Sequence, residues 1–401
     1  MSNIHAALEI GTSRTVLAVG EADANGRLKI TCHAEIPSAG VRKSQILDIP
    51  QVTQSIRSVI HEAEKAQEGA ESSVSIGNAF LVVSGQHIKA DPFSASVQVA
   101  NSRVDEEAMD EVMRAAHLMT LTNDRELLDI VDLDYELDNL RGIASPKGMS
   151  GRILKLNTLQ IHADRNSIQN ARTAAEAVHL EIRDPLFAAT CAADAVLDER
   201  EKHDGVLVLD LGGGSTGYAA YSDGFAVATG VIGVGGDHVT NDIAHAFQTT
   251  NAQAEGLKTR EACATLSTEA GESVRVRVDT SENTLMDNRT VSRHALNTVV
   301  NARLMELLTV IRETLEEQDL LHRLHAGVVL TGGGAQMRHI DALVHQTLGM
   351  NVRIGRPIGV DGLDDVAFPA SFAAISGALI YAHRNYEEHS LLDGILGRFF
   401  K

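Results

Sequence analysis

The chain has 401 residues, of which 44% are hydrophobic, so it can bury a sizeable core in two or three domains or in one large two-lobed fold, and global disorder is excluded. Its 54 acidic and 35 basic residues give a formal net charge of −19. This balance argues against a nucleic-acid partner, because neutralising phosphates requires a basic surface. Three widely spaced cysteines without a CxxC pair argue against a zinc site and favour a reducing compartment. The N-terminus lacks the pattern of a secretory signal, so we expect a cytoplasmic chain.

The first elements form a strand hairpin followed by a helix. Apolar-rich runs at 4–10 and 15–21 flank the turn GTSR, and a third strand is expected at 28–34. A helix at about 51–67 follows from its apolar spacing, and then comes a strand at 78–84.

A polar, mixed segment occupies about 85–160. It contains a helix expected at 105–118, with Asp105 as its N-terminal cap. An α/β pattern resumes near 156 and runs into a helix at 166–179.

The second half repeats the opening pattern. The apolar run at 205–214 predicts a buried strand that ends in a glycine loop, and two more strands follow it. Residues 233–323 are mostly helical, and 326–337 predict a strand, a glycine turn and a helix start. The two acid-and-glycine hairpins, about 200 residues apart, indicate two similar α/β lobes that face each other across a cleft.

The longest uncharged stretch lies at 366–382. Its 17 residues include Pro369, Ser371 and Ser376, whereas a spanning helix needs about 20 strongly apolar residues. We therefore expect a buried, close-packed helix here.

Three glycine turns follow apolar strands and carry the chemistry of the chain. Glycines at a strand end let backbone N–H groups approach an anion closely, and an acid there can hold a hydrated Mg²⁺. Glu9 and Asp210 are these acids in the first two turns, while the third turn, at 332–334, has no preceding acid. None of the turns is a Walker A loop or a GxGxxG fingerprint. Two such turns from opposite lobes predict a site for the phosphate chain of a nucleotide.

The motifs, taken in order, resemble the actin-like ATPase superfamily and, within it, the bacterial FtsA cell-division family. They are LEIGTSR (8–14), PLFAATCAADAVL (185–197), LDLGGGST (209–216), VLTGGGAQ (329–336) and FAAISGALIYA (372–382). Further strings such as YELDNLRGIASPKGMSGRILK and VGGDHVTNDIAHAF are similar to FtsA proteins in particular. The resemblance spans about 8 to 382.

The resemblance implies an α/β, actin-like two-lobed ATPase fold with repeated RNase H-like cores and an inserted FtsA-type α+β subdomain. The expected parts are the start of the first lobe (1–83), the inserted subdomain (84–162), the return to the first lobe (163–204), the second lobe (205–365, with a nucleotide-proximal helical part at about 233–323), a connecting helix (366–384), and a linker with an amphipathic helix (385–401).

The resemblance also implies that ATP binds with Mg²⁺ in the cleft. The matching nucleotide-binding positions are Gly11, Thr12, Ser13, Arg14, Gly212, Gly213, Gly214, Ser215, Gly235, Gly236, Asn241, Glu255, Lys258, Gly332, Gly333 and Gly334, with Glu9 and Asp210 holding Mg²⁺ through water. The alternative interpretation of Glu255 and Lys258 is a surface pair three residues apart on a helix.

One position departs from the superfamily pattern. Many actin-like ATPases have a carboxylate after the second phosphate loop, where this chain has Gly217. Since glycine cannot orient an attacking water, we expect ATP binding with at most weak hydrolysis.

The C-terminal segment carries one apolar stripe at helical spacing. Its members are Leu391, Leu392, Ile395, Leu396, Phe399 and Phe400. The stripe predicts either a helix on a membrane surface or a tail that packs on the protein's own body. FtsA proteins end in a membrane-binding helix, so the resemblance favours the first.

The resemblance implies a polymerising protein at the division septum, on the cytoplasmic side of the inner membrane, that tethers FtsZ filaments and helps recruit other divisome proteins. Arg293, Arg303 and Glu306 match positions implicated in contact with the FtsZ tail; the alternative for Arg303 and Glu306 is a solvated helix pair. A PilM-like pilus-assembly protein and a small-molecule kinase of the same superfamily are the other candidates, although no catalytic base motif of a kinase is found.

Overall fold

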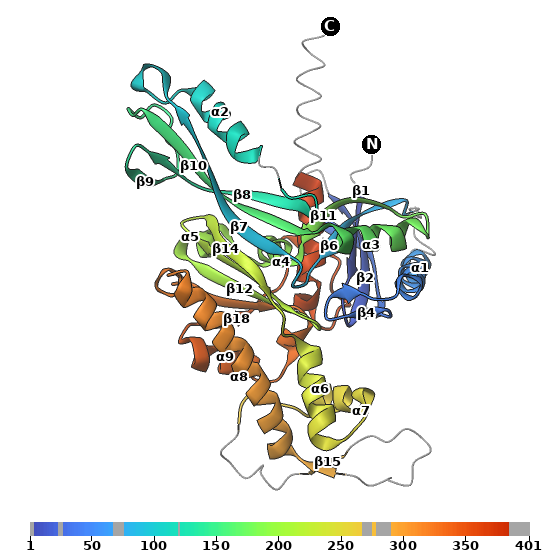
Figure 1. The fold of residues 1–401 in the computed structure, drawn as a ribbon. Coiled ribbons are helices and arrows are strands. Elements are labelled where there is room, and N and C mark those ends of the chain that lie inside the picture. The colour runs from blue at the N-terminus through green and yellow to red at the C-terminus, as the bar shows by residue number, and fades with distance from the viewer. Residues whose placement is uncertain are drawn as a thin grey trace.

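The computed structural model describes residues 4–22, 27–66, 76–118, 121–266, 275–277 and 290–384. Two sheets lie at its centre, and a third sheet projects from them as an arm that carries one helix (Figure 1). The predicted amphipathic stripe at 391–400 lies outside the described residues.

The first central sheet has six strands in the order β11-β6-β1-β2-β3-β19. Their bounds are β1 Ile4–Ile10, β2 Arg14–Ala22, β3 Leu28–Pro37, β6 Asn78–Val83, β11 Glu181–Phe187 and β19 Val360–Asp361. The second has five strands in the order β14-β13-β12-β17-β18. Their bounds are β12 Val206–Leu211, β13 Thr216–Ser222, β14 Phe225–Ile232, β17 Gly327–Thr331 and β18 Val352–Ile354.

The two sheets share one topology. In each, three consecutive strands form an antiparallel meander, and two later strands add in parallel on the side of the first strand. This confirms the repeated RNase H-like cores and the two similar lobes. β19 extends the first sheet by pairing with β3.

The helices enclose both sheets. They are α1 Ile49–Ala66, α3 Arg165–Glu176, α4 Ala188–Val196, α5 Glu199–Asp204, α6 Gly236–Phe247, α7 Asn251–Arg260, α8 Arg293–Glu317, α9 Ile340–Leu348 and a further helix at 373–384, with short 3-10 turns η1 Ala100–Ser102, η3 Leu321–Arg323, η4 Gly333–Gln336 and η5 Pro369–Phe372. α1 and α3 pack together against the first sheet, and α4 contacts strands of both sheets. The expected helices at 51–67, 105–118 and 166–179 are confirmed within a few residues.

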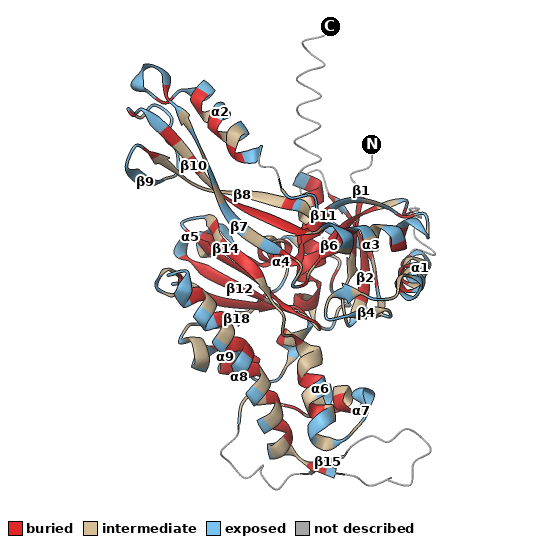
Figure 2. Ribbon diagram, viewed as in Figure 1, coloured by how far each residue is buried: buried red, intermediate tan, exposed pale blue. Residues whose placement is uncertain are grey.

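Alternate residues of β12 enter two different cores. Val206 and Val208 belong to the core that includes α1, α4 and the helix at 373–384, whereas Leu207 and Leu209 belong to the core that includes α8 and α9. All four side chains are fully buried, as the red central strands in Figure 2 show. Burial on both faces explains why this strand reads as a continuous apolar run.

The arm is the predicted inserted segment. Its sheet has the order β7-β10-β8-β9, with β7 Lys89–Gln98, β8 Arg125–Leu137, β9 Leu140–Ile143 and β10 Ile153–Asp164. α2 Glu106–His117 packs on it over a small core of its own. The Asp105 side chain accepts a hydrogen bond from Ala108 N at 2.9 Å, which confirms the cap. The strand predicted near 156 is part of β10, so it belongs to the arm rather than to a lobe.

Two short hairpins complete the fold. β4 Val41–Arg42 pairs with β5 Gln45–Ile46, and β15 Arg275–Arg277 pairs with β16 Thr290–Ser292. No helix in the described part of the chain is both long enough and apolar enough to cross a membrane.

The helix at 373–384 crosses α4 at backbone distance. A Cβ built at Gly377 would overlap the Cys191 carbonyl, so only glycine fits at the crossing. Ile375, Ala378 and Leu379 around it are fully buried. This confirms a buried, close-packed helix in the uncharged stretch, but the helix begins at 373 rather than at 366, after the 3-10 turn η5.

The crossing generates a stability prediction. Gly377→Ala should lower the free energy of unfolding by about 3 kcal/mol, because the added methyl must separate two packed backbones. The matched control is Gly77→Ala, where an added Cβ would meet nothing within 4 Å. We expect the control to stay within about 0.5 kcal/mol of the parent protein in urea unfolding. Equal stability of the two variants would contradict the close crossing.

Candidate functional site

A cavity of about 340 Å³ lies between the lobes, at the ends of β1, β12 and β17. All three predicted glycine turns line it. Its wall also includes Glu9, Arg14, Ser44, Ser84, Asp210, Gly217, Gly235, Gly236, Glu255, Lys258, Thr259, Arg303, Leu304, Leu307, Gln336, Met337, Arg338 and Ser371. The fold therefore brings most of the predicted nucleotide-binding positions to one place.

The glycine turns at 11–13 and 212–214 approach so closely that side chains are excluded. A Cβ at Gly213 would overlap Ser13 Oγ, and one at Gly214 would overlap Thr12 Oγ1. The backbone N–H groups of Thr12, Ser13, Gly213 and Gly214 donate no hydrogen bond within the described part of the chain. Free N–H groups from two opposed turns form a site suited to an anion.

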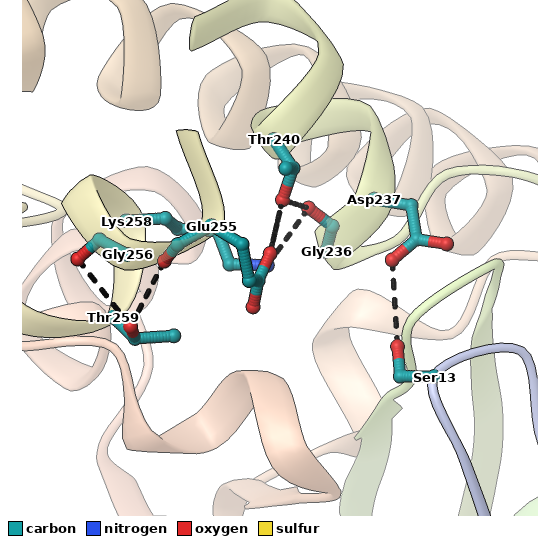
Figure 3. Close-up of polar contacts among 8 residues, drawn as sticks. All are labelled: Ser13, Gly236, Asp237, Thr240, Glu255, Gly256, Lys258 and Thr259. Carbon is teal, nitrogen blue, oxygen red and sulfur yellow. Dashed lines mark hydrogen bonds and ion pairs between the residues drawn. The ribbon is translucent and has the colours of Figure 1, made fainter. Parts of the chain in front are cut away.

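The start of α6 is hydrogen-bonded to the glycine turn at 212–214. Gly236 N donates to the Gly212 carbonyl at 2.9 Å, and Asp237 N donates to the Gly213 carbonyl at 2.8 Å. A Cβ at Gly235 would lie 2.6 Å from both carbonyl oxygens, which explains the glycine. These bonds occupy the first N–H groups of α6, so the helix shapes the loop rather than presenting those groups to an anion. Across the cleft, Ser13 Oγ donates to Asp237 at 3.4 Å (Figure 3).

The two predicted acids lie close together in a largely buried position, with Arg14 as the nearby positive charge. Glu9 Oε2 is buried and has no hydrogen-bond partner among the described residues, and burial raises the pKa of Glu9. Burial, and after it the charge of Glu9, raises the pKa of Asp210 to about 7. Gly332 lets the backbone of the third glycine turn lie close to the Asp210 carboxyl: its φ is +76°, and a Cβ there would lie 2.5 Å from Asp210 Oδ1. A buried carboxylate pair of this kind fits a divalent cation.

Glu255 and Lys258 lie on the far side of the cavity, in a network with α6. Lys258 Nζ contacts Glu255 Oε2 at 2.6 Å and donates to Thr240 Oγ1 at 2.9 Å and to the Gly236 carbonyl at 3.2 Å. Thr240 Oγ1 lies 2.5 Å from Glu255 Oε2. Figure 3 shows the network facing the cleft from α6 and α7. Glu255 and Lys258 do form the ion pair three residues apart that the alternative interpretation expected on a surface helix. They also line the cavity, as the nucleotide-binding interpretation expected.

Arg14 joins the first phosphate loop to the segment before the last helix. Its guanidinium pairs with Glu35 at 2.5 Å and donates to the Ser371 hydroxyl at 3.3 Å and to the Ser371 carbonyl. It also lies 5.3 Å from the centre of the Phe372 ring. Arg14 thus lines the cavity with its donors largely engaged by protein.

The residues predicted to contact FtsZ lie on α8. Arg303 makes two bonds to Asp242 of α6, at 2.6 and 3.1 Å, contacts Glu306 at 2.6 Å, and also lines the cavity. Its hydrogen bond to Asp242 raises the pKa of Arg303. Arg293, at the start of α8, pairs with Glu261 at 2.9 Å. The expected pair of Arg303 and Glu306 exists, and Asp242 adds a partner from another helix.

One predicted residue is not brought to the cavity. Asn241 is exposed on α6 and is absent from the lining, because the face of this helix that turns to α7 and the cleft carries Gly236 and Thr240. Ser44, Thr240 and the run 336–338 were missed, since none of them belongs to a glycine turn or an acid pair. Gly217 does line the cavity, and a Cβ there would lie 2.9 Å from Ala189 Cβ.

Comparison with known proteins gives family matches along most of the chain. The family model described as "Cell division protein FtsA" matches residues 207–377, and the one described as "SHS2 domain inserted in FTSA" matches 85–162. Cell division protein FtsA of Pseudomonas aeruginosa is 34% identical over 374 residues, which is 93% of this chain and 88% of that protein.

Solved structures show the actin-like fold. The PilM–PilN type IV pilus biogenesis complex aligns with a TM-score of 0.67 at 17% identity, covering 94% of this chain and 98% of that one. MreB5 of Spiroplasma citri bound to AMPPNP aligns with a TM-score of 0.52 at 14% identity, covering 98% of each chain. At these identities the likeness concerns the fold alone.

The acid pair generates a prediction about stability and pH. Without metal, the raised pKa of Asp210 keeps its carboxyl protonated in the folded protein up to about pH 7, whereas the unfolded chain ionises near 3.8. The free energy of unfolding therefore falls as pH rises from about 4 to about 7, by up to about 4 kcal/mol from this group. Asp210→Asn removes this loss, so in chelator the variant should be the more stable protein at pH 8, with a smaller advantage at pH 5. Urea unfolding at both pH values checks this prediction. A variant no more stable than the parent at pH 8 would contradict the raised pKa of Asp210 in the folded protein.

Proposed function

Because the chain belongs to the FtsA family of cell division proteins, we propose that it binds ATP, polymerises on the inner face of the cytoplasmic membrane and tethers FtsZ filaments there. The observation that supports nucleotide binding best is the close approach of two glycine loops beside two acids, since backbone N–H groups of both loops donate no hydrogen bond among the described residues.

The residues of the cavity suit a nucleoside triphosphate. The loops at 11–13 and 212–214 would hold the phosphates, because only backbone and small hydroxyl groups occupy the gap between them. Glu255, Lys258 and the turn at 332–334 would hold the nucleoside, since they line the cavity from the second lobe. The lobes would then close on opposite ends of one ligand.

Mg²⁺ fits the acid pair. Glu9 and Asp210 would hold it through water, and the unpartnered Glu9 Oε2 would gain a hydrogen-bond donor. When bound, the ion supplies positive charge that offsets the phosphate oxygens. Protein groups orient the site: Gly332 leaves room for Asp210, and Arg14 lines the cavity beside them.

Weak hydrolysis is part of the proposal. Gly217 pairs with Asp210 across β12 and β13, and it provides no side chain to orient water. The 2.9 Å spacing from a Cβ there to Ala189 means that a carboxylate at this position would have to displace α4. Binding without useful turnover suits a filament subunit that responds to nucleotide.

α8 is the proposed contact for the FtsZ tail. Arg303 lines the cavity from this helix, while Glu306 and Met305 lie toward solvent on it. A partner on α8 would therefore lie one helix thickness from the nucleotide. Other divisome proteins and further copies of the chain are the remaining proposed partners.

Septal location depends on the proposed membrane helix, whose stripe at 391–400 presents two Phe, three Leu and one Ile. Only Arg398 and Lys401 supply nearby positive charge, and the whole chain carries −19. Apolar burial should therefore dominate the attachment, and many weak anchors along a filament would add up. A PilM-like role is the second candidate, but the resemblance to the PilM–PilN complex carries only the fold.

The nucleotide assignment generates a binding prediction. Gly213→Asp should lower the affinity for Mg-ATP at least about 100-fold, because the side chain overlaps Ser13 and its carboxylate repels phosphate. Gly77→Ala serves as a control with unchanged affinity. Isothermal titration calorimetry measures both, and equal affinity of the Asp variant and the parent would refute the loop assignment.

The tethering role generates a sedimentation prediction. FtsZ should pellet with anionic vesicles only when this protein is present, and Phe399→Glu with Phe400→Glu should abolish the effect by charging the apolar stripe. Replacing Arg398 and Lys401 by Gln should weaken pelleting only modestly, since each cation adds about 1 kcal/mol. A double Glu variant that still pellets with lipid would show that the tail is not the anchor. Parent protein that pellets with the vesicles while FtsZ stays in the supernatant would contradict the tethering role.

A further inference from the structure

A hairpin that lies outside the three glycine turns reaches the contact between the phosphate loops. β4 and β5 are joined by Lys43 and Ser44, whose φ values are +50° and +58°. Two consecutive residues in the left-handed region form the tight turn that normally selects Asn-Gly or Gly-Gly. Here Lys and Ser occupy it, so a serine side chain is placed at the tip where a glycine would suit the backbone better.

Ser44 bridges the two lobes. Its backbone N donates to Thr12 Oγ1 at 2.9 Å, and its hydroxyl lies 3.4 Å from Thr12 Oγ1 and 3.1 Å from Ser215 Oγ. Ser44 also lines the cavity. Thr12 belongs to the first phosphate loop and Ser215 ends the second, so one hydroxyl contacts both loops where they meet.

In a bound nucleoside triphosphate, Ser44 would lie near the terminal phosphate. The nucleoside groups of the site, Glu255, Lys258 and the turn at 332–334, all come from the second lobe, whereas Ser44 comes from the first. A phosphate chain that starts at the nucleoside groups and passes between the glycine loops would end at the hairpin tip, because Ser44 contacts Thr12 and Ser215 of the two loops. A diphosphate is one phosphate shorter and would leave this end of the site to the hydroxyls.

Lys43 and Gly85, the neighbours of Ser44, support a role for the hairpin in sensing a terminal phosphate. Lys43 carries its positive charge toward the start of α6: burial lowers the pKa of His238, and the Lys43 ammonium lowers it further. On the other side, a Cβ at Gly85 would lie 2.9 Å from Ser44 Cβ, so the tip rests on the backbone at the root of the arm. Gln86, the next residue, packs against Gly233 just before α6. Movement of the tip would therefore reach both α6 and the arm.

We propose that the hairpin tip is a third phosphate-contacting element, in which Ser44 distinguishes a nucleoside triphosphate from a diphosphate; the inference rests on the nucleotide binding proposed above. Its hydroxyl exchanges the contact with Ser215 for a terminal phosphate oxygen. Because the tip contacts the backbone at Gly85, binding of a terminal phosphate would also shift the root of the arm.

The test compares Mg-ATP and Mg-ADP affinities by calorimetry in the full chain. Ser44→Gly removes the hydroxyl and suits the left-handed backbone, so the variant should fold at least as well as the parent. We expect about tenfold weaker binding of Mg-ATP and an affinity for Mg-ADP within about twofold of the parent, as for loss of one hydrogen bond to a charged group. Ser44→Ala, which keeps Cβ, should show the same selective loss. Gln45→Ala, on the same hairpin but outside the cavity lining, is the control and should bind both nucleotides as the parent does.

The outcomes are distinguishable. Selective loss of ATP affinity in both Ser44 variants supports the proposal. Equal loss of both nucleotides, no loss, or tighter ATP binding overturns it while leaving the proposed function in place. If the parent chain binds neither nucleotide, the proposed function itself fails and the inference fails with it.

Discussion

The close approach of two glycine loops governs the rest of the site. Side chains at Gly213 and Gly214 would overlap Ser13 and Thr12 of the other lobe, so the cleft can narrow to backbone and hydroxyl contacts only because these positions lack Cβ. The same approach leaves N–H groups of both loops without protein acceptors. A ligand that supplies anionic oxygens would satisfy donors from both lobes at once, and this is how binding would connect the lobes.

A second close approach holds the lobes from behind. Gly377 lets the helix at 373–384 cross α4 at the Cys191 carbonyl, and Gly217 lets β13 pack on Ala189 of the same α4. Core residues of both sheets pack around these two helices. The packed crossing resists separation of the lobes, whereas the front of the cleft is closed mainly by hydroxyls. Relative motion of the lobes would therefore open the front first, where Ser13, Ser44 and Ser215 form replaceable polar contacts.

The site lowers the stability of the empty protein. Glu9 and Asp210 are buried together, and the raised pKa of each shows that its ionised form is disfavoured. Well-packed apolar or amide side chains would stabilise the empty fold better. A retained acid pair is the expected cost of a cation site, since binding a cation would favour the ionised forms that burial disfavours.

The sequence alone determined the repeated unit and the glycine turns at its strand ends. Apolar runs buried on both faces, such as β12, and acids two residues before a glycine are local patterns, so the two lobes and their opposed glycine turns could be predicted without coordinates. β11 was missed because Arg183, Asp184 and Pro185 interrupt it, and its pairing with β6 shifts register between Ile182 and Pro185. Only the tertiary structure decided which side chains face the cavity. It placed Asn241 in solvent, connected Arg303 to Asp242, and inserted Ser44 between loops 32 and 171 residues away. No local pattern encodes such contacts, because they depend on how elements distant in the chain meet across the cleft.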